Sequence, residues 1–422
     1  MQESLCDVLL VLWLNFIIPA VPVRLASTFA ELLIGAVLSH SGHITDALYH
    51  VGHRKHHTTY YWMLTSGKWS SLQLNQRLIE LITTRFPRLE FHLLLDDFIC
   101  PRSTDKAPHA QYHHEHSQKP NRPKYLWGQQ WLGLSLSITW GRQHVALPIL
   151  LRLHKSVGNS TKLSRGVMLV KFVLPILKKT GKTIRVLVDS WYIKAPFVLP
   201  LLELGLNVIG QVRKDTVLFE PPVQADKKTR GRPRKYGNRW TPERIEKLPI
   251  KTRTLHVYSG CKEVKYRSVK CLARFLNGRT VIAVWCQLPS QKSWSLILST
   301  DLKLTPERII KLYARRWRTE PMFNEIKHAF GVAQAWQQKS RTLHRWVTIL
   351  CVAYSLSRML ALVLANKKNE NVVPHIAWRQ KSPLTAGLMR KGIQLFFRRF
   401  TFSMLWEPKS KKFVLPKNDL ST

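Results

Sequence analysis

Three acidic residues, Asp96, Asp189 and Glu320, stand where predicted secondary-structure elements end or begin. Mg²⁺ prefers carboxylate oxygens and keeps several waters, so three acids from separate elements are sufficient to hold two ions. Two such ions about 3.5–4 Å apart can activate a nucleophile and stabilise the leaving oxygen when a phosphodiester is cut or transferred. The sequence therefore offers a candidate two-metal site, although a turn explains each acid equally well when it is considered alone.

Glu320 lies in a segment with clear helix signals. Residues 305–307, Thr-Pro-Glu, predict a helix start with a hydroxyl cap, a proline in the first turn and an acid at the positive end of the helix dipole. We expect this helix to run to about Arg318. Pro321 cannot continue it without losing a backbone hydrogen bond, which predicts a restart near Thr319 with Glu320 at the new N-terminus.

The residues around Glu320 follow a fixed spacing. Tyr313, Arg316, Glu320 and Lys327 are separated by two, three and six residues. Taken alone, Arg316 and Glu320 also fit an ordinary surface helix with an i,i+4 ion pair. The whole spacing resembles the pattern around the third acid of bacterial DDE transposases of insertion-sequence family four and its relatives. The resemblance covers roughly residues 25–365.

Two buried strands position the other acids. The apolar stretch 91–95 ends in the pair Asp96 and Asp97, and the stretch 184–188 ends in Asp189. Successive strand residues point to opposite faces, so only one of the paired acids can face the site. We assign Asp96 as the metal ligand, with Asp97 as the alternative.

The intervening elements predict the fold. After the first strand we expect a hairpin, a helix kinked at Pro175, the second acidic strand, a helix broken near Pro196 or Pro200, and a further strand. Their predicted ranges are Leu132–Trp140 with Val145–Arg152, Thr161–Lys179, 184–188, Tyr192–Leu204 and Val208–Val212. This order, with acids after the first and fourth strands, is that of an RNase-H-like mixed α/β sheet.

Four regions are predicted along the chain. They are a helical N-terminal DNA-binding domain (1–88), an RNase-H-like catalytic core (89–213 and 304–366), a β-rich insertion between the second Asp and the Glu (214–303) and a basic C-terminal tail (367–422). The minimal fold does not need residues 214–303, and a β-rich insertion at this place is what the resemblance implies.

The charge of the chain indicates a polyanionic partner. Lys and Arg number 66 against 25 Asp and Glu, a formal charge of +41. The cations are spread along the chain and interleaved with aromatics, which favours nucleic acid over a membrane surface. The apolar runs Leu5–Val23 and Thr348–Asn366 are interrupted by polar residues or prolines, so we interpret both as buried helices and predict no membrane partner.

Cysteine and histidine spacing argues against other metal sites. The six cysteines are scattered without a Cys-x2-Cys pair, which excludes a zinc ribbon and suits a reducing bacterial cytoplasm. The histidines between His40 and His57 and the run His113–His116, which we place in a loop over Arg102–Lys124, lack the spacing of a metal site. We interpret them as surface or DNA-facing residues.

The resemblance implies an activity and its partners. It implies a nucleoid-associated enzyme that uses Mg²⁺, or Mn²⁺ in its place, to cut at the terminal inverted repeats of a mobile element and join the ends to target DNA as a homodimer. It also implies that Tyr313, Arg316 and Lys327 contact phosphates near the cut. A tryptophan of the insertion stacks on a flipped base in relatives, and Trp294 is our candidate, with core packing as the alternative.

Further DNA contacts are expected at the start of the insertion. Arg213 and Lys214 open it, and a basic run rich in Gly and Pro follows. Arg232 and Arg234, in the sequence Gly-Arg-Pro-Arg, resemble an AT-hook that enters an A·T minor groove. A loop that touches phosphates is the alternative.

Two other functions fit the same residues. One is a catalytically inactive DNA-binding relative, and the other is an RNase-H-like nuclease that resolves or repairs DNA. The β-rich insertion and the Tyr-Arg-Glu-Lys spacing favour transposition over both.

Overall fold

The computed structural model describes residues 4–52, 54–87, 90–114, 123–141, 143–155, 159–222, 234–258, 260–365 and 383–416. The chain divides into two compact units, which are described separately. Unit 1 comprises Met1–Arg88, Asp97–Lys155 and Glu320–Thr422, and unit 2 comprises Leu89–Asp96 and Ser156–Thr319. The chain passes from one unit to the other inside strand β1 and inside helix α10.

Unit 1 is mainly helical. Its helices are α1 (Leu5–Ile17), α2 (Ala26–Leu38), α3 (Ile44–Val51), α4 (His57–Thr65), α5 (Ser71–Arg85), α11 (Ser340–Leu364), α12 (Ala386–Arg399) and α13 (Phe402–Leu405). Its strands are β2 (Gln111–His114), β3 (Tyr125–Trp140), β4 (Gln143–His154), β12 (Trp406–Glu407) and β13 (Lys412–Phe413), together with the second half of β1 (Glu90–Pro101). The predicted helical character of the N-terminal residues is confirmed.

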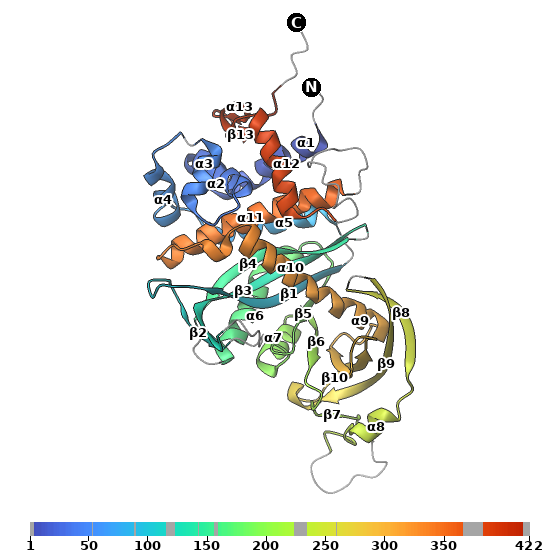
Figure 1. Cartoon of the computed structure of the whole chain (residues 1–422). Coiled ribbons are helices and arrows are strands. Elements are labelled where there is room, and N and C mark those ends of the chain that lie inside the picture. Colours follow the sequence, from blue (N-terminus) through green and yellow to red (C-terminus); the bar gives the residue numbers. More distant parts are fainter. Residues whose placement is uncertain are drawn as a thin grey trace. The chain divides into compact units, whose positions relative to one another are not determined.

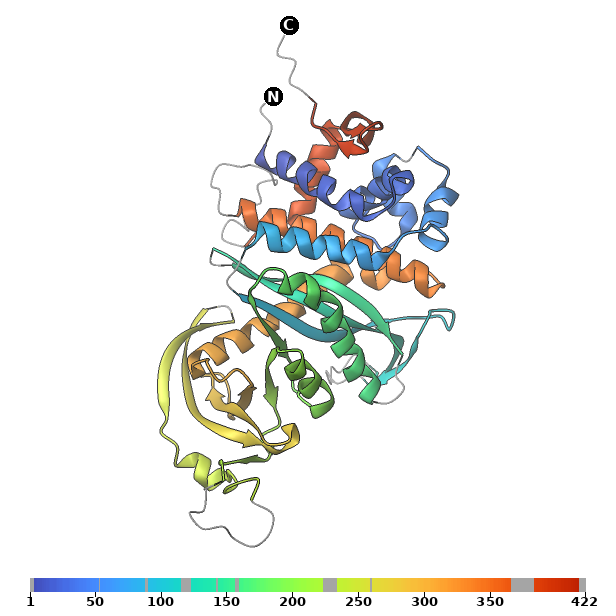
Figure 2. The same ribbon diagram turned by 180° about the vertical axis from the view of Figure 1, so that it is seen from behind.

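Helix α11 is the central helix of unit 1. It packs against α2, α5 and β4, and Figure 2 shows α11 and α5 side by side along the β3–β4 hairpin. Within the described residues it is the one helix whose length and apolar composition would let it cross a membrane, and 89% of its most apolar window is buried. The interpretation of this run as a core helix is confirmed as far as Leu364, while Asn366 lies outside the described residues.

The hairpin of unit 1 is longer than predicted. β3 begins at Tyr125, seven residues before the expected Leu132, and pairs antiparallel with β4. The predicted loop over Arg102–Lys124 is corrected by β2, in which His113 and His114 pair with the start of β3. Tyr112 and Trp127 contact each other across these strands, with ring centroids 5.0 Å apart, and such cross-strand aromatic pairs stabilise a hairpin.

Unit 2 is built on a mixed sheet. Its strands are β5 (Thr183–Val188), β6 (Asn207–Val212), β7 (Leu218–Phe219), β8 (Lys251–Val257), β9 (Gly260–Ala273), β10 (Arg279–Gln287) and β11 (Ser295–Ser299), with the first half of β1. Its helices are α6 (Asn159–Lys178), α7 (Ala195–Glu203), α8 (Pro242–Glu246), α9 (Pro306–Arg315) and the start of α10 (Thr319–Asn324). The strand order is β1-β5-β6-β11-β10-β9-β7. β8 lies off this order and pairs antiparallel with β9.

The first three strands of unit 2 form its parallel part. β1 pairs with β5 and β5 pairs with β6, both in parallel. Leu95 of β1 packs toward Gly166 of α6, where an added Cβ would lie 2.8 Å from the leucine side chain. α6 and α7 therefore supply the parallel crossovers, and together with the antiparallel β3–β4 pair of unit 1 these pairings confirm the predicted RNase-H-like class.

The strands of the predicted insertion continue this sheet. β11 pairs antiparallel with β6, and β10 and β9 follow it. Figure 1 shows β8, β9 and β10 curving around α9, whose apolar side packs on β6, β10 and β11. The predicted β-rich character of residues 214–303 is present, while the four domain boundaries stay predictions.

Proline positions differ from the expectation for α7. Pro196 lies in its first turn, where the missing N–H has no helical partner to lose. Pro200 lies inside the same helix, which runs without a break from Ala195 to Glu203. The predicted break is therefore wrong, and the first proline marks the start of the helix instead.

None of the six cysteines forms a disulfide, as the scattered spacing predicts. All six lie in the described residues, and only Cys261 is exposed. Burial raises the pKa of the Cys100 thiol to about 11 and those of Cys271 and Cys286 to about 12.

Candidate active site

Asp96 and Asp189 directly follow the last paired residues of two adjacent parallel strands, β1 and β5. Leu95 pairs with Val188 in the β1–β5 register, and each acid is the next residue along its strand or just after it. Parallel neighbours lie about 4.8 Å apart, so the two residues meet at the same edge of the sheet in unit 2. The predicted strand end is confirmed for Asp189, which directly follows β5, but it is wrong for Asp96, because β1 continues to Pro101 and only its parallel pairing with β5 stops at Leu95.

Asp189 is oriented by the turn that follows β5. Its Oδ1 accepts hydrogen bonds from the backbone N–H groups of Trp191, at 3.1 Å, and Tyr192, at 3.4 Å. Short polar side chains form such local turns readily. The ring of Trp191 lies between two ammonium groups, with Lys162 Nζ 4.1 Å and Lys194 Nζ 4.4 Å from its centroid.

Asp96 is held by the helical segment that precedes Glu320. Arg316 Nη1 donates to Asp96 Oδ2 at 2.9 Å. The Thr319 hydroxyl donates to the Arg316 carbonyl at 2.7 Å and lies 3.4 Å from the same Asp96 oxygen. The side chains of Arg316 and Asp96 are 14% and 16% exposed, so water screens this pair only weakly. In unit 2, the residues before Glu320 therefore contact the first acid of the predicted set.

The charges around Arg316 act on its own protonation and on that of Tyr313. Burial alone would lower the pKa of Arg316, but Tyr313, Asp96 and Asp189 raise it above its ordinary value. Burial raises the pKa of Tyr313 to about 12, so its hydroxyl keeps its proton and donates to Gln211 Oε1 at 3.0 Å. Arg316 is thus a permanent cation between two carboxylates.

Asp97 has a different environment from Asp96. In unit 1 its Oδ2 accepts from Gln130 Nε2 on β3 at 2.5 Å. Because consecutive strand residues point to opposite faces, this contact accounts for the second acid of the pair without a role at the sheet edge. The assignment of Asp96 as the metal ligand stays a prediction.

The segment carrying Glu320 confirms most of the helix signals. Thr305 caps α9 by accepting from the N–H of Arg308, at 3.3 Å. The 3-10 turn η4 (Arg316–Arg318) separates α9 from α10, so the predicted restart near Thr319 is confirmed. Glu320 lies in the first turn of α10 and is exposed.

The helix widens after α10. Residues Glu325–Ala329 form a π-helical turn, η5, instead of continuing as α-helix. This single turn carries Lys327, whose Nζ lies 5.7 Å from the ring centroid of Phe98 in unit 1. Such π turns occur often at functional sites, and the sequence carries no proline or glycine here that would have announced it.

A buried ion network supports the start of β1 and was not foreseen. Arg185 of β5 donates to Asp301 at 2.8 Å and also to Glu90, which in turn accepts from Arg308 of α9. The hydrogen bond from His92, together with the charges of His92 and the two arginines, outweighs burial and lowers the pKa of Glu90. Burial lowers the pKa of His92. The sequence signal for this network was Arg185, a cation in the middle of a buried strand.

The other predicted DNA contacts lie in unit 2. Trp294 is half-buried beside Arg267, whose guanidinium carbon lies 5.1 Å from its ring centroid. Arg213 pairs with Asp215 in an exposed ion pair at 3.0 Å and lines a cavity of about 660 Å³ with Ser190 and Arg274.

The remaining predicted contacts are less constrained. Lys214 and Arg234 are exposed. Arg232 lies outside the described residues.

A further group of side chains in unit 1 could hold a metal ion. The ligand atoms of His40, Asp46 and His50 lie within 4.8 Å of one another, the one such group among the described residues. Asp46 already accepts from the hydroxyls of Ser39, at 2.5 Å, and Ser41, at 2.8 Å. Spacing alone did not indicate this group because α3 (Ile44–Val51) brings the three residues together.

Comparison with family models gives a match over much of the chain. A family model described as a transposase DDE domain matches residues 104–356, more than half of the 422 residues. No curated protein matches the chain significantly.

Proposed function

Because the chain belongs to the family of transposase DDE domains, we propose that it cuts DNA at the ends of a mobile element and joins them to target DNA. The observation that carries this proposal is the placement of Asp96 and Asp189 after paired residues of adjacent parallel strands, with Arg316 bound to Asp96. The third acid, Glu320, directly follows Thr319, whose hydroxyl contacts Asp96.

The donor set fits divalent metal ions. Asp96, Asp189 and Glu320 offer carboxylate oxygens, the ligands that Mg²⁺ and Mn²⁺ prefer. Arg316 already neutralises Asp96, which indicates that the carboxylates of this edge need a positive partner. In the proposed complex the three acids hold two metal ions, which supply the nucleophile activation and leaving-group stabilisation of phosphodiester chemistry.

The neighbouring residues have positioning roles in this proposal. Arg316 presents a planar donor set that suits a phosphate bidentately, and its raised pKa keeps it charged. Tyr313 keeps its proton, since burial raises its pKa to about 12, and serves as a hydrogen-bond donor to a phosphate. Lys327 supplies a second cation.

Finer parts of the proposal come from the Tyr-Arg-Glu-Lys spacing. It supports a cut-and-paste transposase of the insertion-sequence type that recognises terminal inverted repeats as a dimer. Trp294, Arg213, Lys214, Arg232 and Arg234 are proposed as DNA contacts. A bacterial cytoplasmic location follows from the same proposal.

Cleavage of a labelled duplex tests the reaction. The duplex carries the terminal repeat that flanks the gene, and cutting is followed with Mg²⁺, with Mn²⁺ and with EDTA. We expect metal-dependent cutting at the repeat boundary. Asp189→Asn should reduce it more than about 100-fold while DNA binding persists, since even loss of a residue that only hydrogen-bonds to a metal ligand costs about 10–100-fold.

Glu203→Gln is the control, because Glu203 is an exposed acid of the same unit at the end of α7. It should leave cutting unchanged. Tight, salt-sensitive binding without cutting under any metal would instead identify an inactive DNA-binding relative. Cutting that ignores the repeat boundary would identify a nuclease of another kind.

A further inference from the structure

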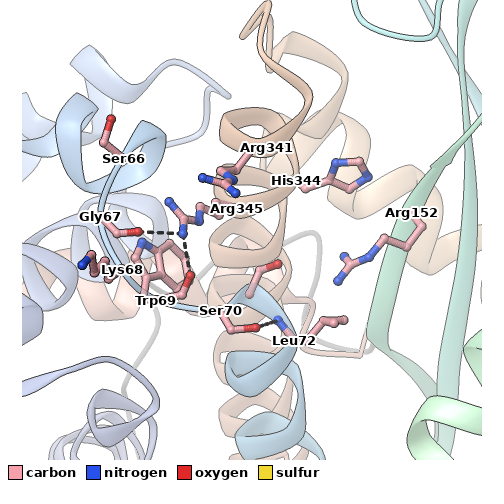
Figure 3. A pocket seen from close by; sticks show the side chains of 11 residues that line it. Ser66, Gly67, Lys68, Trp69, Ser70, Leu72, Arg152, Arg341, His344 and Arg345 are labelled. Atoms are coloured by element: carbon pink, nitrogen blue, oxygen red, sulfur yellow. Dashed lines mark hydrogen bonds between the residues drawn. The ribbon is translucent and has the colours of Figure 1, made fainter.

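Unit 1 contains a cavity of about 510 Å³ that none of the three acids lines. Figure 3 shows that it is bounded by the loop between α4 and α5, by β4 and by the start of α11. The lining residues are Ser66–Leu72, Arg152, Arg341, His344 and Arg345. The proposed function gives this cavity no role.

The cavity is lined by cations and by no acid. Lys68, Arg152, Arg341 and Arg345 all contribute, and none of its lining residues, all of them described, is Asp or Glu. Burial and the nearby Arg341 lower the pKa of Arg345. Burial lowers the pKa of Arg152 to about 10. Four like charges around one cavity repel one another, and an anion within it would relieve that repulsion.

Part of this charge is fixed in place by the fold. The guanidinium of Arg345 donates to the carbonyls of Leu64, at 3.0 Å, and Gly67, at 2.8 Å, and so shapes the loop before α5. His344 accepts from the N–H of Leu153 and lies 2.8 Å from the carbonyl of Ser340, an arrangement that fits a neutral imidazole. The ammonium of Lys68 and the guanidinium of Arg341, by contrast, are exposed.

Two long helices begin at the cavity. Ser71 and Leu72 belong to the first turn of α5, and Arg341 belongs to the first turn of α11. Ser70 caps α5 by accepting from the N–H of Leu72, at 3.2 Å. The N-terminal ends of both helices carry partial positive charge, which adds to the field of the four side chains.

We propose that this cavity binds the phosphates of a DNA strand, as a contact separate from the three acids. This inference rests on the proposed function. A cavity of this volume exceeds the size of one phosphate, and its cations lie both at depth (Arg152, Arg345) and on the exposed side (Lys68, Arg341). That distribution suits a sugar-phosphate chain better than a single small anion.

The salt dependence of DNA binding tests the proposal. The probe is a duplex of arbitrary sequence, and the variant is Lys68→Gln with Arg341→Gln. Each phosphate contact contributes about 0.9 to the slope of log affinity against log salt. We expect the slope to fall by about 1–2, and binding to weaken equally for all sequences. Both residues are exposed, so the fold is retained.

The matched control is Lys409→Gln with Lys412→Gln, which removes two exposed cations of the same unit outside the cavity. It should change the slope less. An equal slope for the variant and the control would overturn the proposal.

A charge placed inside the cavity gives an independent readout. Ser71→Glu puts a carboxylate among the cations at the start of α5, so we expect a higher Tm together with weaker DNA binding. Gln76→Glu adds the same charge further along α5, outside the cavity lining, and should do neither. If Ser71→Glu weakens DNA binding but does not raise the Tm, the new carboxylate does not interact with the cations of the cavity. That result would overturn the proposal.

Inorganic phosphate distinguishes DNA from a free anion. If phosphate raises the Tm of the wild type but not of the Lys68 and Arg341 variant, while both bind DNA alike, the cavity takes a free anion and the DNA assignment fails. Cleavage is scored separately. If the Lys68 and Arg341 variant has the same salt slope as the control but the protein still cuts DNA with metal, only this inference is rejected. If the slopes differ but the protein does not cut DNA, only the proposed reaction is rejected.

Discussion

At the scale of single residues, the two acids that end the first predicted strand have separate surroundings. Asp96 contacts Arg316 and Thr319, whereas Asp97 contacts Gln130. The strand alternation could be predicted from the sequence, and so could the spacing that places Arg316 before Glu320. The partner of Arg316 could not, because Asp96 lies 220 positions away and only folding brings the two together.

Substitution of each acid tests this distinction. Asp96→Asn should abolish metal-dependent cleavage, because it removes a proposed metal ligand. Asp97→Asn should retain most of it, since an amide still accepts a hydrogen bond from Gln130. Cleavage of the repeat duplex in parallel reactions measures both. A loss of cutting in the Asp97 variant equal to that in the Asp96 variant would contradict the assignment.

At the scale of elements, local signals predicted starts better than ends. Thr305 and Pro306 gave the start of α9 to the residue. β1 was expected to end at Asp97 but continues to Pro101, because the apolar Phe98, Ile99 and Cys100 keep pairing favourable past the acids. The π turn after α10 depends on tertiary contacts, which spacing alone does not reveal.

The loop that follows this π turn is unusually close to the N-terminal helices of unit 1. Gly331 has a φ of +71°, and a Cβ there would lie 1.9 Å from the backbone nitrogen of Gly42. Gly331→Ala should therefore destabilise the protein by about 3 kcal/mol or more, through both strain and collision. Gly52→Ala provides the comparison, since its φ is +60° with open space around it.

Gly52→Ala should lower the free energy of unfolding by only about 1–2 kcal/mol, the cost of the left-handed backbone conformation alone. Urea unfolding of the two variants measures the difference. Equal destabilisation would show that the contact between Gly331 and Gly42 does not form in solution.

At the scale of the whole molecule, the composition predicted the excess of positive charge, but it did not predict the buried ion pairs. The +41 charge indicated a polyanionic partner, while the network of Glu90, Arg185 and Asp301 joins residues far apart in the chain. It makes the stability of unit 2 depend on pH. The folded pKa values of Glu90 and His92 are both lowered, so the unfolded chain binds more protons and stability rises with pH.

We therefore expect stability to fall as the pH drops below about 6.5, where unfolded His92 gains its proton, and further below about 4.5 for Glu90. Glu90→Gln should cost about 3 kcal/mol at neutral pH, because it leaves the buried Arg185 short of a partner. It should also flatten the acid part of the profile. Urea unfolding between pH 4 and 7 measures this, with the exposed Glu246→Gln as control; parallel profiles for the two variants would contradict it.

The burial of five of the six thiols makes the chain a ready subject for spectroscopy. Burial keeps a dye from all five, and it raises the pKa of the Cys100, Cys271, Cys286 and Cys351 thiols, which keeps these protonated and slow to react. A maleimide dye at neutral pH should therefore attach at Cys261 without any cysteine being replaced. That residue lies at the start of β9, beside the turn from β8. The fluorescence of a dye there would show whether the surroundings of this hairpin change when the protein binds DNA.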